Sequence, residues 1–169
     1  MLKNFCTILL VLASFTGLQA QSDFHYYDIK METPSEYAAN DSMVYEAAND
    51  LLNLPAASIG TDPVALDKLL FVMKWMSGTP DYSFSITSPI VKATKKDEML
   101  LGIYLASAIK FAMENKEDRA NEELMSMGAL KGFFEYVQNP SNGVKPNKYL
   151  KKLIKAKEDG TLMEFLKKK

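Results

Sequence analysis

The chain has 169 residues, a formal net charge of −1, one cysteine and one histidine. This length fits one domain that buries about two-thirds of its unfolded surface, which is enough for a hydrophobic core. A single cysteine excludes a disulfide framework within the chain. A single histidine excludes the zinc-protease motif, which needs two.

The first 20 residues have the anatomy of a secretory signal peptide. Lys3 precedes an uncharged run that is most apolar between Phe5 and Ala13, and this run is too short to span a bilayer. Ala20 suits the last residue before cleavage. Cys6 lies inside the run and not at its end, which argues against a lipid-modified cysteine. We therefore predict an exported protein, periplasmic or secreted, whose mature chain has no transmembrane span.

Residues 21–34 show no clear helical period and are expected to form an extended N-terminal arm. A first firm helix should begin at Asp41 or Ser42, since either can act as an N-cap, and should end before Pro55. Its apolar residues recur at helical spacing: Val44, Ala47, Ala48, Leu51 and Leu52. Asp41-Ser42-Met43 also resembles an O-glycosylation acceptor of some exported bacterial proteins, whereas capping explains the first two residues equally well.

Asp62 at an N-cap and Pro63 at the first helical position predict a second helix. Gly78 is expected to end it in the left-handed conformation. Apolar residues cover most of this helix, so that it should be mostly surrounded by other helices. Its charged residues cluster on one narrow face: Asp67, Lys68 and Lys74.

After this helix, residues 81–87 alternate between apolar and polar side chains, which predicts one short extended segment. Tyr82, Phe84 and Ile86 should point inward, and the two serines between them should point outward. The segment could pair with the N-terminal arm or lie alone across a groove between helices.

Two uses of the neighbouring aromatic side chains are open. Core packing is the favoured interpretation. The alternative is a slot for a small apolar ligand, or a contact with a partner, made by the following residues: Trp75, Tyr82, Phe84, Tyr104 and Phe111.

A third helix is expected from Lys96 or Asp97 to Asn115. Its almost unbroken apolar middle predicts a buried core helix that is too short to span a bilayer. A fourth helix is expected from about Asp118 to Val137. Its apolar residues also recur at helical spacing: Ala120, Leu124, Met127, Leu130, Phe134 and Val137.

The C-terminal part, 145–169, is expected to form lysine-rich helices after a loop over 139–143. One helix should run over 146–157 and stop at Gly160. A capping-box pattern then opens a final short helix over 162–168.

Charge is distributed unevenly along the mature chain. Residues 145–169 carry nine lysines and three acidic residues, a net charge of +6, whereas residues 21–144 carry a net charge of −8. The basic end could contact an anionic glycan or lipid headgroups. The favoured interpretation is a solvated helix face that complements the acidic body, with Lys167–Lys169 favourable at a helix C-terminus. A nucleic-acid partner is not expected, because export and the absence of interleaved aromatic residues argue against it.

No catalytic motif is found, and no catalytic residue, cofactor or metal is expected. A serine–histidine mechanism would depend on His25, which belongs to the peripheral arm. The carboxylate pairs Asp97–Glu98 and Glu122–Glu123 are adjacent in sequence. Adjacent residues of a helix project about 100° apart, so neither pair converges on one bond.

The combination of a signal peptide, the sequence WMSGTPDYSFSI, the helix LLGIYLASAIKFAMEN and a lysine-rich end resembles a group of small exported helical bacterial proteins without established function. This resemblance covers most of the mature chain and supplies no catalytic residue.

The sequence therefore predicts a mainly α-helical, single-domain bundle of about five helices with one extended segment. The leading functional hypothesis is an exported, non-enzymatic envelope protein that binds a protein partner or an anionic cell-wall glycan. The alternatives are a carrier of a small apolar ligand between helices and an enzyme with an unrecognised carboxylate site.

Overall fold

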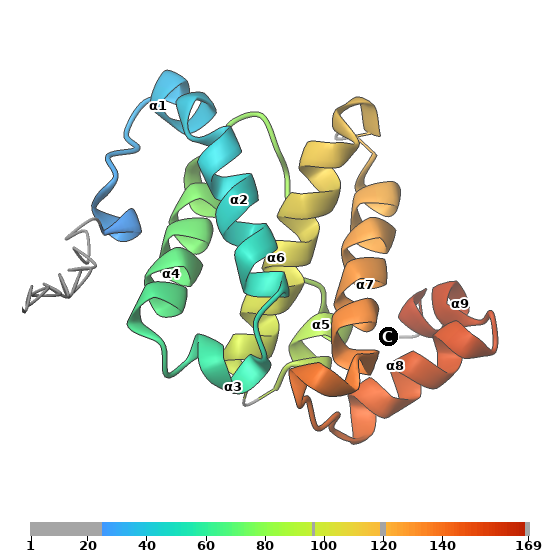
Figure 1. The fold of residues 1–169 in the computed structure, drawn as a ribbon. Helices are drawn as coiled ribbons and strands as arrows, with labels where there is room; N and C mark the ends of the chain where they lie inside the picture. Colours follow the sequence, from blue (N-terminus) through green and yellow to red (C-terminus); the bar gives the residue numbers. More distant parts are fainter. Residues whose placement is uncertain (1–24, 96, 119–120, 168–169) are drawn as a thin grey trace, which may run out of the picture.

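The computed structural model describes residues 25–95, 97–118 and 121–167, and every regular element within these ranges is a helix. The predicted mainly α-helical bundle is therefore confirmed (Figure 1). Its long helices are α2 (Asp41–Leu52), α4 (Pro63–Gly78), α6 (Glu98–Glu114), α7 (Glu122–Gln138) and α8 (Lys148–Glu158). Its short helices are α1 (Pro34–Ala39), α3 (Ala56–Ile59), α5 (Ser88–Ala93) and α9 (Leu162–Lys167). The 3₁₀ turns are η1 (Tyr26–Asp28), η2 (Lys116–Asp118) and η3 (Pro140–Asn142).

Helix α6 lies at the centre of the bundle. It packs against α7 on one side and against α2 and α4 on the other (Figure 1). The Asp97 carboxylate begins it by accepting a hydrogen bond from the Leu100 N–H at 3.0 Å. Ten of its 17 residues are buried, which confirms the predicted core helix.

Three short helices were not among those expected from the sequence. Helix α1 is stabilised by a capping box, in which Thr33 accepts from the Glu36 N–H and the Glu36 carboxylate accepts from the Thr33 N–H. Helices α3 and α5 have four and six residues, too few for a hydrophobic period to be read. None of the described helices is long and apolar enough to cross a membrane.

Helix α8 packs against α5, and α9 packs back against α8 (Figure 1). Asn147 begins α8, because its side-chain oxygen accepts hydrogen bonds from the N–H groups of Tyr149 and Leu150, both at 2.9 Å. Gly160 adopts a left-handed φ of 70° directly after the helix. The predicted stop at Gly160 is therefore confirmed.

The prediction that Gly78 ends α4 in the left-handed conformation is wrong. Asp62 and Pro63 begin the helix as expected. Gly78, however, belongs to the last turn and has no left-handed φ, and Thr79 is the C-cap. A Cβ at position 78 would overlap the side chain of Tyr37. Gly78 is thus required for close packing and not for a positive φ.

The N-terminal arm is not extended throughout, because residues 26–28 form the turn η1, which packs on α4. The Asp67 carboxylate accepts hydrogen bonds from the N–H groups of Tyr26 (2.6 Å) and Tyr27 (3.0 Å). The Lys74 ammonium donates to the carbonyls of Tyr27 (2.9 Å) and Ile29 (2.8 Å). The charged face of α4 is therefore the face that binds the arm.

As a result, α4 is less enclosed than predicted. Leu66, Leu70 and Met73 recur at helical spacing on a side of α4 that no other described element covers fully, and they are 36%, 41% and 44% exposed. The arm binds Asp67 and Lys74, and the neighbouring apolar side chains of α4 remain partly exposed.

The segment over 81–87 has no regular secondary structure, and the described residues contain no strand. Tyr82 is buried, Phe84 is half-buried and Ser83 and Ser85 are exposed, as predicted. Ile86 is 49% exposed, so the prediction that it points inward is wrong. The alternation ends early because the Ser85 carbonyl is held by the Tyr104 hydroxyl and the chain then turns into α5.

Candidate functional site

Three of the predicted ligand-contact residues pack on one another. The ring centroid of Trp75 lies 5.4 Å from that of Tyr82 and 6.1 Å from that of Phe84, and the latter two rings are stacked at 6.3 Å. Trp75 is fully buried, and its indole N–H donates to the Tyr37 carbonyl at 3.1 Å. The three rings therefore cover one another's surfaces, which a bound apolar ligand would otherwise contact.

The two other predicted residues, Tyr104 and Phe111, both belong to α6. Tyr104 meets Phe133 edge-on, with 6.0 Å between ring centroids, while Phe111 packs so closely on Gly128 that a Cβ there would overlap its ring. The cavity beside Tyr104 and Phe84 has a volume of about 10 Å³. This volume is close to that of one water molecule and far below a ligand site of several hundred Å³.

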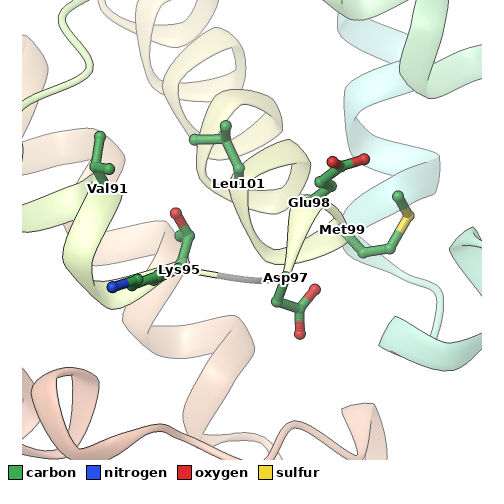
Figure 2. Close-up of a pocket in the computed structure, with 7 residues that line it drawn as sticks. Val91, Lys95, Asp97, Glu98, Met99 and Leu101 are labelled. Atoms are coloured by element: carbon green, nitrogen blue, oxygen red, sulfur yellow. The ribbon is translucent and has the colours of Figure 1, made fainter.

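A wide hollow of about 610 Å³ lies over the start of α6 (Figure 2). Its apolar surface comes from Val91, Met99 and Leu101, and its charged groups belong to Lys95, Asp97 and Glu98. Figure 2 shows the two carboxylates pointing to different sides of the helix end. Their divergence agrees with the prediction that adjacent carboxylates do not converge on one bond.

Two carboxylates at the ends of α6 have structural roles. Asp97 caps α6, as described above. Glu114 accepts hydrogen bonds from Lys110 (2.6 Å) and from the Tyr45 hydroxyl (2.8 Å). The hydrogen bond from Lys110 lowers the pKa of Glu114, and the same contact raises the pKa of Lys110. Glu114 is therefore held as an ion pair and not as a proton donor.

His25, the only histidine, is peripheral as predicted. Its side chain is 67% exposed, and its Nδ1 lies 4.0 Å from the Asp67 carboxylate that binds the arm. Within the described ranges, no group of three or more His, Cys, Asp or Glu side chains could hold a metal ion.

Helix α8 carries a cluster of exposed lysines. Four exposed lysines lie within about 100° of arc around the helix, given 100° per residue. We call them the lysine face: Lys148, Lys151, Lys152 and Lys155. Leu150, Leu153 and Ala156 are buried on the opposite side. The four lysines of this face thus lie on the side of α8 that points away from its buried residues.

Few acidic groups neutralise the lysine face. Lys155 forms a salt bridge with Asp159 at 3.0 Å. No other member of the face lies within 4.0 Å of an acidic side chain in the part of the chain that the structure describes. Lys157 projects from another side of α8, where it donates to Gln138 (3.0 Å) and lies over the Phe134 ring. The lysines thus face solvent and do not pair with the acidic body.

The N-terminus of α8 lies beside two of these lysines and adds to their positive charge through the helix dipole. No acidic residue occupies its first turn, and Lys148 and Lys151 lie there instead. The N-terminus of a helix carries about half a positive charge from the aligned peptide dipoles. The sequence located the lysine-rich end, but it could not show that the lysines project together from the positive end of a helix.

Comparison of the chain with protein-family models, curated proteins and solved structures gave no match.

Proposed function

We propose that this protein is an exported, non-enzymatic envelope protein that binds an anionic cell-wall glycan through the lysine face of α8. The carrying observation is that Lys148, Lys151 and Lys152 project together into solvent without an acidic partner among the described residues. Clustered cations on one face attract polyanions by raising the local electrostatic potential.

The placement of the lysines supports a role beyond folding. Cations in the last turn of a helix stabilise it, whereas cations in the first turn oppose its dipole, each by about 0.3–1 kcal/mol. Lys155 and Lys157 lie in the last turn, where they favour the helix. Lys148 and Lys151 lie at the unfavourable end. Stability therefore does not account for them, and binding of an anion does.

The two other functional hypotheses have less support. A carrier of an apolar ligand needs a cavity between helices, and the space beside Phe84 and Tyr104 measures about 10 Å³. A carboxylate enzyme needs converging acids, and Asp97 and Glu98 diverge (Figure 2).

The test is binding of the chain from residue 21 to immobilised polygalacturonate, a linear glycan with one carboxylate per sugar. The mature chain has more acidic than basic residues, so retention on an anionic matrix requires a local basic surface. We expect retention at low salt and elution as salt is raised, because exposed charges are screened.

The matched variants remove two charges each. The pair Lys148→Gln and Lys152→Gln should weaken binding roughly tenfold, since each lysine near an anionic surface contributes about 1 kcal/mol at most. The control pair Lys30→Gln and Lys116→Gln removes two exposed lysines from the arm and from η2, far from α8 (Figure 1). Equal losses for the two pairs, or no retention of the unaltered chain, would overturn the proposal.

A further inference from the structure

The lysine face does not end at the N-terminus of α8. The Asn147 side-chain amide donates to the carbonyls of Ala93 (2.7 Å) and Lys92 (3.3 Å), which ties the end of α5 to the start of α8. The Lys92 ammonium lies 5.8 Å from the centre of the Tyr149 ring. Lys92 is exposed, and it is more than fifty residues away from α8 in sequence. The fold therefore brings a cation from another helix next to the first turn of α8.

Lys145 is an exposed lysine two residues before Asn147 in sequence. Lys145 lines a smaller hollow of about 360 Å³ together with Asp97 and Met99. We define the lysine track as the lysine face extended by these two side chains, Lys92 and Lys145. Along α8, Lys148, Lys152 and Lys155 are spaced about 4.5–6 Å apart in axial rise. The track is thus elongated.

Acidic residues lie near both ends of the track. Glu158 and Asp159 follow the last lysine of α8, and Asp159 already pairs with Lys155. At the other end, Asp97 and Glu98 line the hollow beside α5 (Figure 2).

The chemistry of the track favours an extended polyanion over a membrane. No large apolar side chain of α8 or α9 is exposed within the described residues, so neither helix offers groups that insert into lipid. Every cation of the track is a lysine, a point charge that contacts successive anionic groups without the fixed geometry of an arginine. The aromatic ring at the junction, Tyr149, is half-buried against Phe165 and does not offer a free face for stacking of bases.

We infer that an extended anionic glycan chain lies lengthwise on α8 and crosses onto α5 at Asn147, so that Lys92 and Lys145 bind it together with the lysine face. This inference rests on the proposed function and adds the length and path of the ligand. A short oligosaccharide can occupy α8 alone, whereas a longer one reaches both helices.

The experiment measures the affinity of galacturonate oligomers of increasing length by calorimetry at fixed salt. Three double variants are compared: Lys92→Gln with Lys145→Gln, Lys152→Gln with Lys155→Gln, and the control Lys30→Gln with Lys116→Gln. Asn147 bonds to the backbone of Lys92, so substitution of that lysine side chain leaves the junction intact.

We call the variant at Lys92 and Lys145 the α5-side pair and the variant at Lys152 and Lys155 the α8 pair. For long oligomers, each of these two variants should bind roughly tenfold more weakly than the control variant. For short oligomers, only the α8 pair should lose affinity. If the α5-side pair matches the control at every length while the α8 pair is weakened, the path onto α5 is wrong and the proposed function stands. If no oligomer binds the unaltered chain, the proposed function itself fails.

Two further probes test the class of ligand. Polyphosphate of matched length should bind with similar dependence on the track, since lysines do not distinguish carboxylate from phosphate by geometry. Tighter binding to single-stranded DNA, or to vesicles with anionic headgroups, than to either polymer would overturn the assignment to a glycan.

Discussion

The side chain of Tyr37 packs directly against the Cα of Gly78, which leaves no space for a Cβ. The same region holds the core tryptophan, because the Tyr37 carbonyl accepts the hydrogen bond of the Trp75 indole at 3.1 Å. Tyr37 belongs to α1 and Gly78 to the last turn of α4. This contact therefore fixes a short helix on the end of a long one.

Substitution of Gly78 by alanine should destabilise the protein. Alanine ordinarily stabilises a helix relative to glycine by about 0.5–1 kcal/mol, because glycine has more freedom to lose on folding. Here the added methyl group must displace Tyr37, and overpacking costs about 1–3 kcal/mol. We expect the free energy of unfolding, measured in urea, to fall.

Gly60 provides the matched control. A Cβ at Gly60 would lie 3.6 Å from the Met99 sulfur, which is an ordinary contact, and its φ of −84° suits any residue. Gly60→Ala should leave stability unchanged or raise it slightly. Equal effects of the two substitutions would contradict the role assigned to Tyr37.

The arm should detach when Asp67 is replaced by alanine. The Asp67 carboxylate is 17% exposed and accepts hydrogen bonds from two consecutive backbone N–H groups, those of Tyr26 and Tyr27. Hydrogen bonds to charged groups contribute about 1.5–3 kcal/mol. Amide hydrogen exchange at these two residues should become much faster, while amides of α6 keep their protection.

Asp81→Ala is the control for this prediction, because Asp81 is exposed in the segment that follows α4. It should leave exchange in the arm unchanged. Slow exchange of the Tyr26 and Tyr27 amides in the Asp67 variant would show that Lys74 and the tyrosine rings suffice to hold the arm.

The long helices could be predicted because their signals are local. Asp62 caps α4 as predicted, α6 begins directly after Asp97, and Gly160 stops α8. Apolar periodicity adds the buried face, as in α6. The capping box of α1, formed by Thr33 and Glu36, was also readable in the sequence and was missed.

Other features depend on contacts between distant segments. The residue before Ile86 is held by a hydrogen bond from the Tyr104 hydroxyl to the Ser85 carbonyl, a contact between segments 19 residues apart. Asp67 and Lys74 bind backbone groups of the arm some 40 to 47 residues earlier, although a charged helix face ordinarily indicates solvent. The aromatic residues proposed as a ligand slot are divided among separate packing contacts for the same reason.

Tyr136 should make stability depend on pH in the alkaline range. Its hydroxyl donates to the Leu54 carbonyl at 2.7 Å. Burial, with a further contribution from Asp97, raises the pKa of Tyr136 from 10.0 to about 12. The folded protein thus keeps a proton that the unfolded chain releases. The stabilisation is complete below pH 10 and is lost as the pH rises through 12.

Tyr136→Phe tests this dependence. The variant should be about 1 kcal/mol less stable near neutral pH, because the hydrogen bond to Leu54 is lost. The difference from the unaltered protein should shrink above pH 10, where only the unaltered protein has this proton to lose. Urea unfolding at several pH values measures both effects, and parallel curves for the two proteins would contradict the prediction.

Replacing Lys148 or Lys151 by glutamate should affect stability and binding in opposite directions. Both lysines lie in the first turn of α8, where an acidic side chain favours the helix dipole. We expect each substitution to raise the free energy of unfolding by about 0.3–1 kcal/mol. The same change places a negative charge on the lysine face, so binding to polygalacturonate should fall more than for the glutamine variants.

Lys157→Glu gives the reverse pattern. Lys157 lies in the last turn of α8 and contacts Gln138 outside the lysine face, so its replacement should lower stability by a similar amount and leave binding nearly unchanged. A loss of stability in the Lys148 variant would instead indicate that this lysine is retained for folding. Helix stability would then no longer support an anionic partner, because the unfavourable position of Lys148 and Lys151 would no longer distinguish the lysine face from an ordinary solvated helix face.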